Sequence, residues 1–185
     1  MSQNLQSFMR GTGMLRSVVN RVPADAWDQP SCCEGWTARE VAGHITWGLR
    51  STGGVAAGDG MAEQAPEAEI AGADPAASVT AAIDDAIAAL DQPGAIQRDT
   101  PFGMPMDAFL SLMAVDSMTH AWDIADATGI DHGIDGASAT AALAAMAPMA
   151  ERMRGPGRFD DAVITDSDDP VDQLIAFLGR TSVRS

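Results

Sequence analysis

The longest helical pattern in the chain is MDAFLSLMAVDSMTHAWDIADAT, residues 106–128, and Gly129 follows it directly. Glycine is common at the first position after a helix, because it adopts a left-handed conformation there at no steric cost. The stretch therefore predicts one long helix that ends at Thr128. The other strong patterns also have the helical period, and no segment shows the strand-type alternation of polar and apolar residues.

Helical patterns flank this stretch on both sides. Thr37-Ala-Arg-Glu40 has the form of a capping box, which marks the N-terminus of a helix. A short apolar run at 171–178 predicts a helical tail that docks back on the body of the protein. Apolar residues three and four apart predict four further helices, over residues 5–22, from 37 into the fifties, over 76–90 and over 137–153.

Two segments between these helices are expected to be links. Residues 53–75 are rich in Gly, Ala and acids, and they predict a surface loop with a short helical turn. Residues 95–105 predict an irregular crossover connection. Four or five helices without strands indicate an all-α fold, a four-helix bundle with a short helical tail. We find no internal repeat, so residues 1–185 are expected to form one domain.

The charge of the chain excludes some function classes. With 26 acidic and 11 basic side chains, the formal net charge of the 185 residues is −15. Nucleic acid is therefore not expected as a partner, because binding it requires clustered positive charge. The basic residues are all arginines, and a chain without lysine has neither a Schiff-base lysine nor a phosphate-loop lysine.

The sequence also bears on the compartment. No window approaches 18 uninterrupted apolar residues, and the start MSQNLQSFMR lacks the basic and apolar regions of a secretory signal. The two cysteines, Cys32 and Cys33, are adjacent, so a disulfide between them would not join distant parts of the chain. We therefore expect a reduced, cytoplasmic protein that has no membrane partner.

Three residues in the predicted helices have side chains suited to hold a metal ion. Asp116 and His120 stand four apart on the longest helix, which places both side chains on one face. His44 lies among apolar residues on the capped second helix. Two imidazoles and one carboxylate, with a further position left for water, are typical of a catalytic divalent-metal site. The alternative is that the histidines are core residues and that Asp116 and His120 form an ordinary helix-surface pair.

Further residues are candidates for the surroundings of such a site. Asp123 follows His120 by three residues, so it either accepts the second N–H of that imidazole or is an exposed carboxylate on the helix. Trp36 and Trp47 either wall a pocket or pack in the core. Arg39 either binds a substrate carboxylate or forms a surface ion pair.

Three stretches together carry a family resemblance: PSCCEGWTAREVAGH at 30–44, DSMTHAWDIADATG at 116–129 after Pro101-Phe-Gly, and RGPG at 154–157 with LIAFLGR at 174–180. They resemble the signatures of the DinB-like, mycothiol-dependent maleylpyruvate isomerase-like metal-binding proteins, in their short single-domain form. The resemblance spans nearly the whole chain, and the combination is more specific than any one stretch.

The resemblance implies a DinB-like four-helix bundle in which His44, Asp116 and His120 hold a divalent metal. The metal is usually zinc, with nickel, manganese and iron as alternatives. The implied co-substrate is mycothiol or a similar thiol, which loses its proton on coordination and attacks a small electrophile. The better-known isomerases of the family carry an additional C-terminal domain. This chain stops about where that domain begins, so maleylpyruvate isomerisation itself is not expected.

Three functions stay open at this point. The first is a metal-dependent thiol S-transferase or isomerase acting on small molecules. The second is a stress protein that binds a metal or ligand without turnover. The third is a thiol redox sensor built on Cys32 and Cys33, which we rank last because a disulfide between adjacent cysteines is strained. The sequence does not fix the oligomeric state, and a homodimer is one arrangement that it leaves open.

Overall fold

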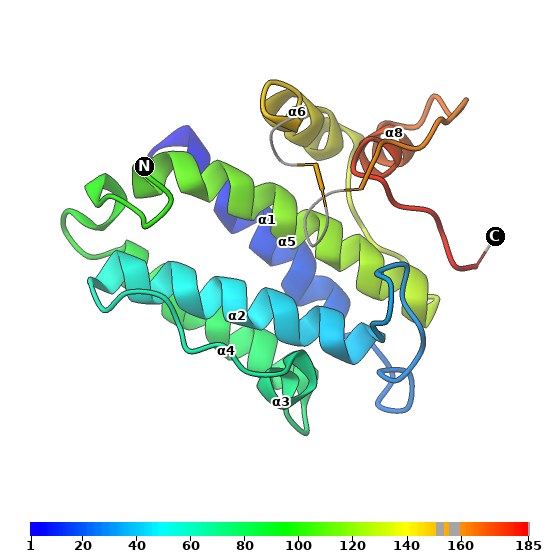
Figure 1. The fold of residues 1–185 in the computed structure, drawn as a ribbon, viewed down its shortest axis with the longest axis horizontal. Helices are drawn as coiled ribbons and strands as arrows, with labels where there is room; N and C mark the ends of the chain where they lie inside the picture. The colour runs from blue at the N-terminus through cyan, green and yellow to red at the C-terminus, as the bar shows by residue number, and fades with distance from the viewer. Residues whose placement is uncertain (151–153, 156–159, 185) are drawn as a thin grey trace.

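The computed structural model describes residues 1–150, 154–155 and 160–184, and every regular element among them is a helix (Figure 1). The prediction of an all-α fold is confirmed. None of the described helices combines the length and the hydrophobicity that a membrane span requires. The elements are α1 (Gln3–Val19), α2 (Ala38–Ala57), α3 (Glu67–Ala71), α4 (Pro75–Leu90), the 3-10 helix η1 (Ala95–Gln97), α5 (Met106–Thr128), α6 (Gly136–Met146) and α8 (Pro170–Phe177).

The long helix predicted over 106–128 is α5, with the same bounds, and Gly129 closes it at φ +71°. The first helix was predicted to reach residue 22, whereas α1 ends at Val19. Pro23 accounts for this difference, because a proline disfavours helical backbone at the residue before it. The chain therefore leaves the helix shortly before the proline.

The capping box at the start of α2 is present, since the backbone N–H of Thr37 donates to Glu40 Oε2 at 2.7 Å. The prediction that a loop begins at residue 53 is wrong, because α2 continues to Ala57. A Cβ at Gly53 would lie 3.3 Å from the Cα of Ala86 on α4. Glycine at this position thus allows two helices to approach closely, and it does not mark a turn.

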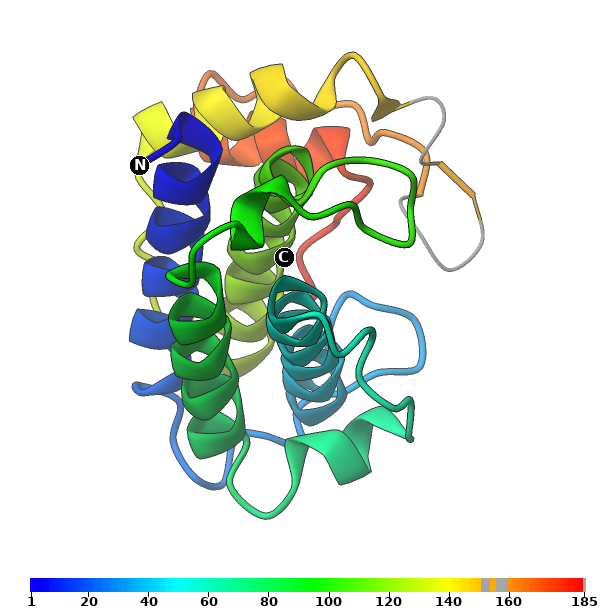
Figure 2. The same cartoon turned by 90° about the vertical axis from the view of Figure 1, so that its left-hand side faces the viewer.

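Four helices form the bundle around one apolar core. α1 packs chiefly on α5 and α2 on α4, and contacts of α2 with α5 and of α1 with α4 close the ring (Figure 2). The link at 91–105, which contains η1, joins α4 to α5 across this ring. The side chains that fill the core include Phe8, Leu15, Ile45, Leu49, Ile83, Met106, Leu110 and Ile124, all of them essentially without solvent exposure.

A second apolar cluster lies on the outer side of α5, where α6 and α8 pack against each other (Figure 1). The predicted docking of the 171–178 tail is confirmed. The helix predicted over 137–153 ends as α6 at Met146, and residues 151–153 of that prediction lie outside the described residues. The cluster contains Val115, Met118, Ile134, Ala139, Ala142, Met146, Val171, Leu174, Ile175 and Leu178.

Two glycines on α1 give a matched test of this packing. A Cβ on Gly11 would lie 2.5 Å from the carbonyl oxygen of Ala114 on α5, whereas a Cβ on the exposed Gly13 would meet nothing within 4 Å. We expect Gly11→Ala to lower the free energy of unfolding by about 1–3 kcal/mol, because the helices must move apart. Gly13→Ala is expected to raise it by about 0.5–1 kcal/mol, because alanine favours a helix interior.

Urea unfolding of both variants beside the wild type measures this difference. Equal unfolding midpoints for Gly11→Ala and Gly13→Ala would contradict the close α1–α5 contact.

Candidate metal centre

The structure brings His44, Asp116 and His120 together between α2 and α5. One ligand atom from each side chain can be chosen so that the three atoms lie within 4.8 Å of one another. The Nε2 of His120 is 3.4 Å from Asp116 Oδ1, and the ring centroids of His44 and His120 are 5.0 Å apart. Two facing helices thus present two imidazoles and a carboxylate to a common point.

The neighbourhood of His44 explains how the cluster fits between the two helices. Gly48 lies one turn after His44, and a Cβ there would be 3.3 Å from Met113 Cε and 4.0 Å from Asp116 Oδ2. The glycine therefore leaves room for the Met113 side chain, and α2 lies close to Asp116 at this turn. On the other side, the Trp36 ring lies against the His44 imidazole, with centroids 5.1 Å apart. Trp36 thus stands beside the cluster and also packs against the apolar core of the bundle, so it fits both interpretations made from the sequence.

Asp123 fixes the orientation of His120. The Nδ1 of His120 lies 2.8 Å from Asp123 Oδ2, and the carboxylate is fully buried. This contact occupies one nitrogen of the ring and leaves Nε2 directed toward Asp116. A carboxylate in this position selects the ring tautomer in which Nε2 is available as a ligand.

The charges of the cluster shift the pKa values of its members in different directions. Burial by itself lowers the pKa of His120, but Asp116 and Asp123 outweigh burial and raise it to about 10. Burial and the neighbouring His120 lower the pKa of His44. Burial opposes ionisation of Asp116, yet the two histidines lower its pKa. In the metal-free protein His120 is therefore an imidazolium between two carboxylates, and His44 is neutral near pH 7.

A second group of residues lies at the same place: the sequence had drawn attention to Cys32 and Cys33 but not to their position beside Asp123, and Arg180 was not expected there. The carboxylate of Asp123 accepts hydrogen bonds from Cys32 Sγ at 3.1 Å, from Cys33 Sγ at 3.5 Å and from Arg180 Nε at 3.4 Å. Only 10% of the Arg180 side chain is exposed. In the sequence, Arg180 ends the LIAFLGR stretch, and its position directly after an apolar run was the one signal of a buried arginine.

Asp123 is ionised in these surroundings. Burial raises its pKa, but the contacts with His120, Arg180 and Cys32 bring the value down to about 2. Arg180 lies in the segment that follows α8 and reaches Asp123 from there. Ser182 of the same segment donates its hydroxyl to Asp126 on α5 at 2.5 Å. Figure 1 shows that the segment after α8 and the loop before α2 run toward the C-terminal end of α5.

The two thiols differ electrostatically. The pKa of Cys32 is raised by its hydrogen bond to Cys33, by burial and by the charge of Asp123. The pKa of Cys33 is lowered by the hydrogen bond from Cys32 and by the positive charges of His120 and Arg180, against the effects of burial and Asp123. Cys33 is therefore the thiol of the pair that ionises more easily.

Two predicted pocket residues make their contacts elsewhere. Arg39 Nε donates to Asp28 Oδ1 at 2.9 Å, and its Nη1 donates to the carbonyl oxygen of Gly72 at 3.0 Å. This is the surface ion pair that the sequence left open as the alternative. The indole N–H of Trp47 donates to the carbonyl oxygen of Ala62 at 3.1 Å, so Trp47 holds the loop that follows α2.

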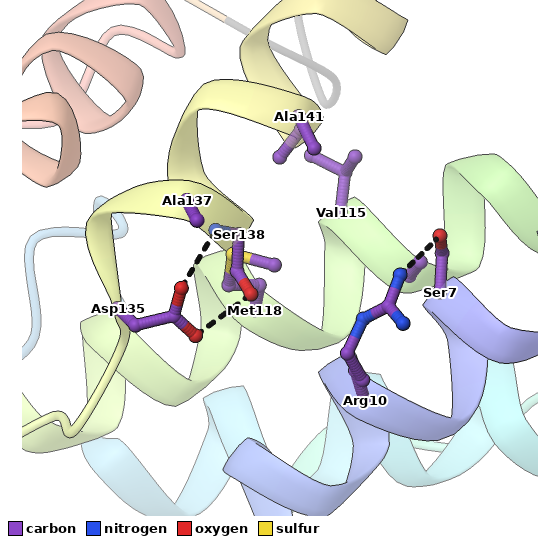
Figure 3. Close-up of a pocket in the computed structure, with 10 residues that line it drawn as sticks. Ser7, Arg10, Val115, Met118, Asp135, Ala137, Ser138 and Ala141 are labelled. Carbon is purple, nitrogen blue, oxygen red and sulfur yellow. Dashed lines mark hydrogen bonds between the residues drawn. The ribbon is translucent and has the colours of Figure 1, made fainter.

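A cavity of about 350 Å³ lies between α1, α5 and the start of α6 (Figure 3). Arg10 and Ser7 border it on α1, where the guanidinium donates to the hydroxyl at 3.2 Å. Asp135 and Ser138 border it at the N-terminus of α6. None of the residues that line this cavity belongs to the metal-ligand cluster or contacts Asp123.

Comparison with known proteins places the chain among relatives over nearly its whole length. The model of the mycothiol maleylpyruvate isomerase N-terminal domain matches residues 8–125, a range that contains the three candidate ligands and Asp123. Two uncharacterized proteins, from two strains of Mycobacterium tuberculosis, are each 32% identical over 183 residues, which cover 96% of this chain and 97% of each relative. No solved structure matches the chain.

The raised pKa of His120 predicts how the stability of the metal-free protein depends on pH. The unfolded histidine has a pKa of about 6.5, and the folded value is about 10. The stabilisation by the imidazolium is fully present below about pH 6.5 and is lost as pH rises through the folded value. Between these limits we expect the free energy of unfolding to fall by up to about 1.4 kcal/mol per pH unit.

Urea titrations of EDTA-treated protein across this range measure the effect, and His120→Gln is expected to remove most of the slope. The comparison is made below about pH 8, because above it the two cysteines ionise in the unfolded chain and the raised pKa of Cys32 adds a slope of its own. The same slope in wild type and His120→Gln would show that His120 is not held as an imidazolium.

Proposed function

Because the chain belongs to the family of mycothiol maleylpyruvate isomerase N-terminal domains, we propose that it is a divalent-metal-dependent S-transferase or isomerase. Its substrates are small electrophiles, and its co-substrate is a low-molecular-weight thiol such as mycothiol. The observation that carries the proposal is the convergence of His44 from α2 with Asp116 and His120 from α5.

The donor set fits a divalent metal. Two imidazole nitrogens and one carboxylate oxygen are a ligand combination found in catalytic zinc sites, which keep a further position open. The same donors accept nickel, manganese or iron, and we propose zinc because two imidazoles and one carboxylate form a common catalytic zinc site. The Asp116 side chain is 28% exposed, so the cluster is accessible from solvent on the carboxylate side. The three ligands and their accessibility therefore support a site that a small thiol can reach.

A bound zinc ion supplies the positive charge that deprotonates a coordinating thiol. The protein's own residues orient the ligands and balance the charges of the proposed metal centre. Asp123 takes the Nδ1–H of His120 and keeps Nε2 free for the ligand role. Arg180 compensates the charge of Asp123 from the other side. His120 must give up its second proton when a metal binds, because a metal ligand has to be deprotonated at the ligating atom.

The negative charge of the chain does not oppose this chemistry. A metal at the cluster provides local positive charge regardless of the net charge of −15. The Trp36 ring packs against the His44 imidazole and limits its movement. The chain thus holds two ligand rings firmly, one by hydrogen bonding and one by packing, which is what a preorganised site requires.

Elemental analysis of tag-free protein tests the metal centre. We expect about one equivalent of a divalent metal per chain in the wild type and in His132→Ala, since His132 lies in the loop before α6, outside the cluster. The metal should be lost in His44→Ala and in His120→Ala, while circular dichroism shows unchanged helicity. Absence of metal in the wild type, even after incubation with zinc, nickel and manganese, would refute the metal centre.

The catalytic part of the proposal has its own readout. Wild type and His132→Ala are expected to consume chlorodinitrobenzene when mycothiol is present, and the two metal-free variants are expected not to. Retention of metal without any thiol-dependent turnover of this or other small electrophiles would instead support the non-catalytic metal-binding stress protein.

A further inference from the structure

The two cysteines form a second cluster that the proposed function does not use. Both lie in the loop before α2, both are half-buried, and both thiols point at the carboxylate of Asp123. One ligand atom each from Cys32, Cys33 and Asp123 lie within 4.8 Å of one another. The loop and α5 thus hold two thiols against one side of a buried carboxylate.

The pair is better suited to bind one atom between its sulfurs than to form a disulfide. Adjacent Cα atoms are about 3.8 Å apart, whereas disulfides join Cα atoms that are about 4.4–6.8 Å apart. Both cysteines are free thiols in the structure. An atom bonded to both sulfurs leaves a larger distance between them than the direct S–S bond of a disulfide. The dithiol therefore has the geometry of a chelating site for a thiophilic atom.

The groups bonded to Asp123 limit which kind of thiophilic atom can bind at the two cysteines. Arg180 Nε is 3.4 Å from Asp123 Oδ1, and His120 Nδ1 is 2.8 Å from Asp123 Oδ2. A divalent cation at the cysteines would need ligands beyond the two sulfurs, and the Arg180 guanidinium and the His120 ring already occupy the Asp123 oxygens. It would also compete with both groups for the same carboxylate. A trivalent thiophile bonds the two sulfurs and keeps its third bond for a hydroxyl or an organic group, so it makes no demand on the Asp123 carboxylate.

We propose that Cys32 and Cys33 form a dithiol binding site for trivalent arsenicals. Arsenous acid, As(OH)₃, is neutral near pH 7 and reacts with two thiols by exchange of its hydroxyl groups. Each sulfur forms a bond to arsenic, each departing hydroxyl leaves as water with the proton of that thiol, and one hydroxyl stays on arsenic. Arsenic remains trivalent throughout, so the step needs no oxidant or reductant.

Asp123 supports this exchange by its position. Its carboxylate accepts the S–H of both cysteines, which orients the two thiols toward one side. When the thiols are consumed, Asp123 still keeps His120 and Arg180 as partners, so no buried charge is left unpaired. Occupation of the dithiol therefore does not require the carboxylate to move.

Native mass spectrometry of the metal-free, reduced protein tests the proposal with arsenite and with phenylarsine oxide. We expect one arsenical per chain in the wild type, with loss of two waters for arsenite, and release by 2,3-dimercaptopropanol but not by an equal concentration of a monothiol. Cys32→Ser and Cys33→Ser are each expected to weaken binding by roughly 100-fold, because a single thiol loses the chelate effect. His132→Ala serves as the control and is expected to bind as the wild type does.

Two results would overturn the proposal. One is arsenite binding in either single cysteine variant as tight as in the wild type, which would exclude chelation by the pair. The other is tight uptake of Cd²⁺ that depends on both cysteines, together with weak arsenite binding, which would make the cluster a site for soft cations. Neither result bears on the metal content of the histidine cluster, so the proposed function is tested separately.

Discussion

The structure depends on one buried carboxylate. Asp123 is fully buried, and an uncompensated charge in such a place is costly. Its oxygens accept from His120, Arg180, Cys32 and Cys33, which belong to α5, to the segment after α8 and to the loop before α2. The interaction that compensates the charge therefore joins three distant parts of the chain. It also orients the central ring of the proposed metal centre, so fold and site share one constraint.

The same network of hydrogen bonds and ion pairs balances the buried charges of the metal-free protein. His120 carries a proton between Asp116 and Asp123, and Arg180 adds a second positive charge beside Asp123. Two carboxylates thus face two cations when no metal is bound. A divalent metal in the proposed centre would take the place of the proton on His120, and the Asp116 carboxylate would help to balance its charge.

Much of this could be predicted from local patterns. The helical period and Gly129 predicted α5 with its observed bounds, and the i,i+4 spacing of Asp116 and His120 predicted a shared face. The family resemblance also grouped His44 with Asp116 and His120, but the distant partners of Asp123 could not be predicted. Arg180 is 57 residues from Asp123 and Cys32 is 91 residues from it, so no local periodicity relates them. The loop predicted from Gly53 was wrong for the same reason. The glycine allows α4 to approach α2 closely, and this contact is not visible in the local sequence.

The most direct test of the account is the zinc K-edge X-ray absorption spectrum of the zinc-loaded protein in thiol-free buffer. We predict a first shell of nitrogen and oxygen atoms only, at about 2.0–2.2 Å, with the outer-shell scattering of imidazole rings. His44 and His120 supply these rings, and Asp116 supplies the carboxylate. A sulfur shell at about 2.3 Å would contradict it. Such a shell would place zinc at Cys32 and Cys33, and the histidine cluster would then be packing around Asp123.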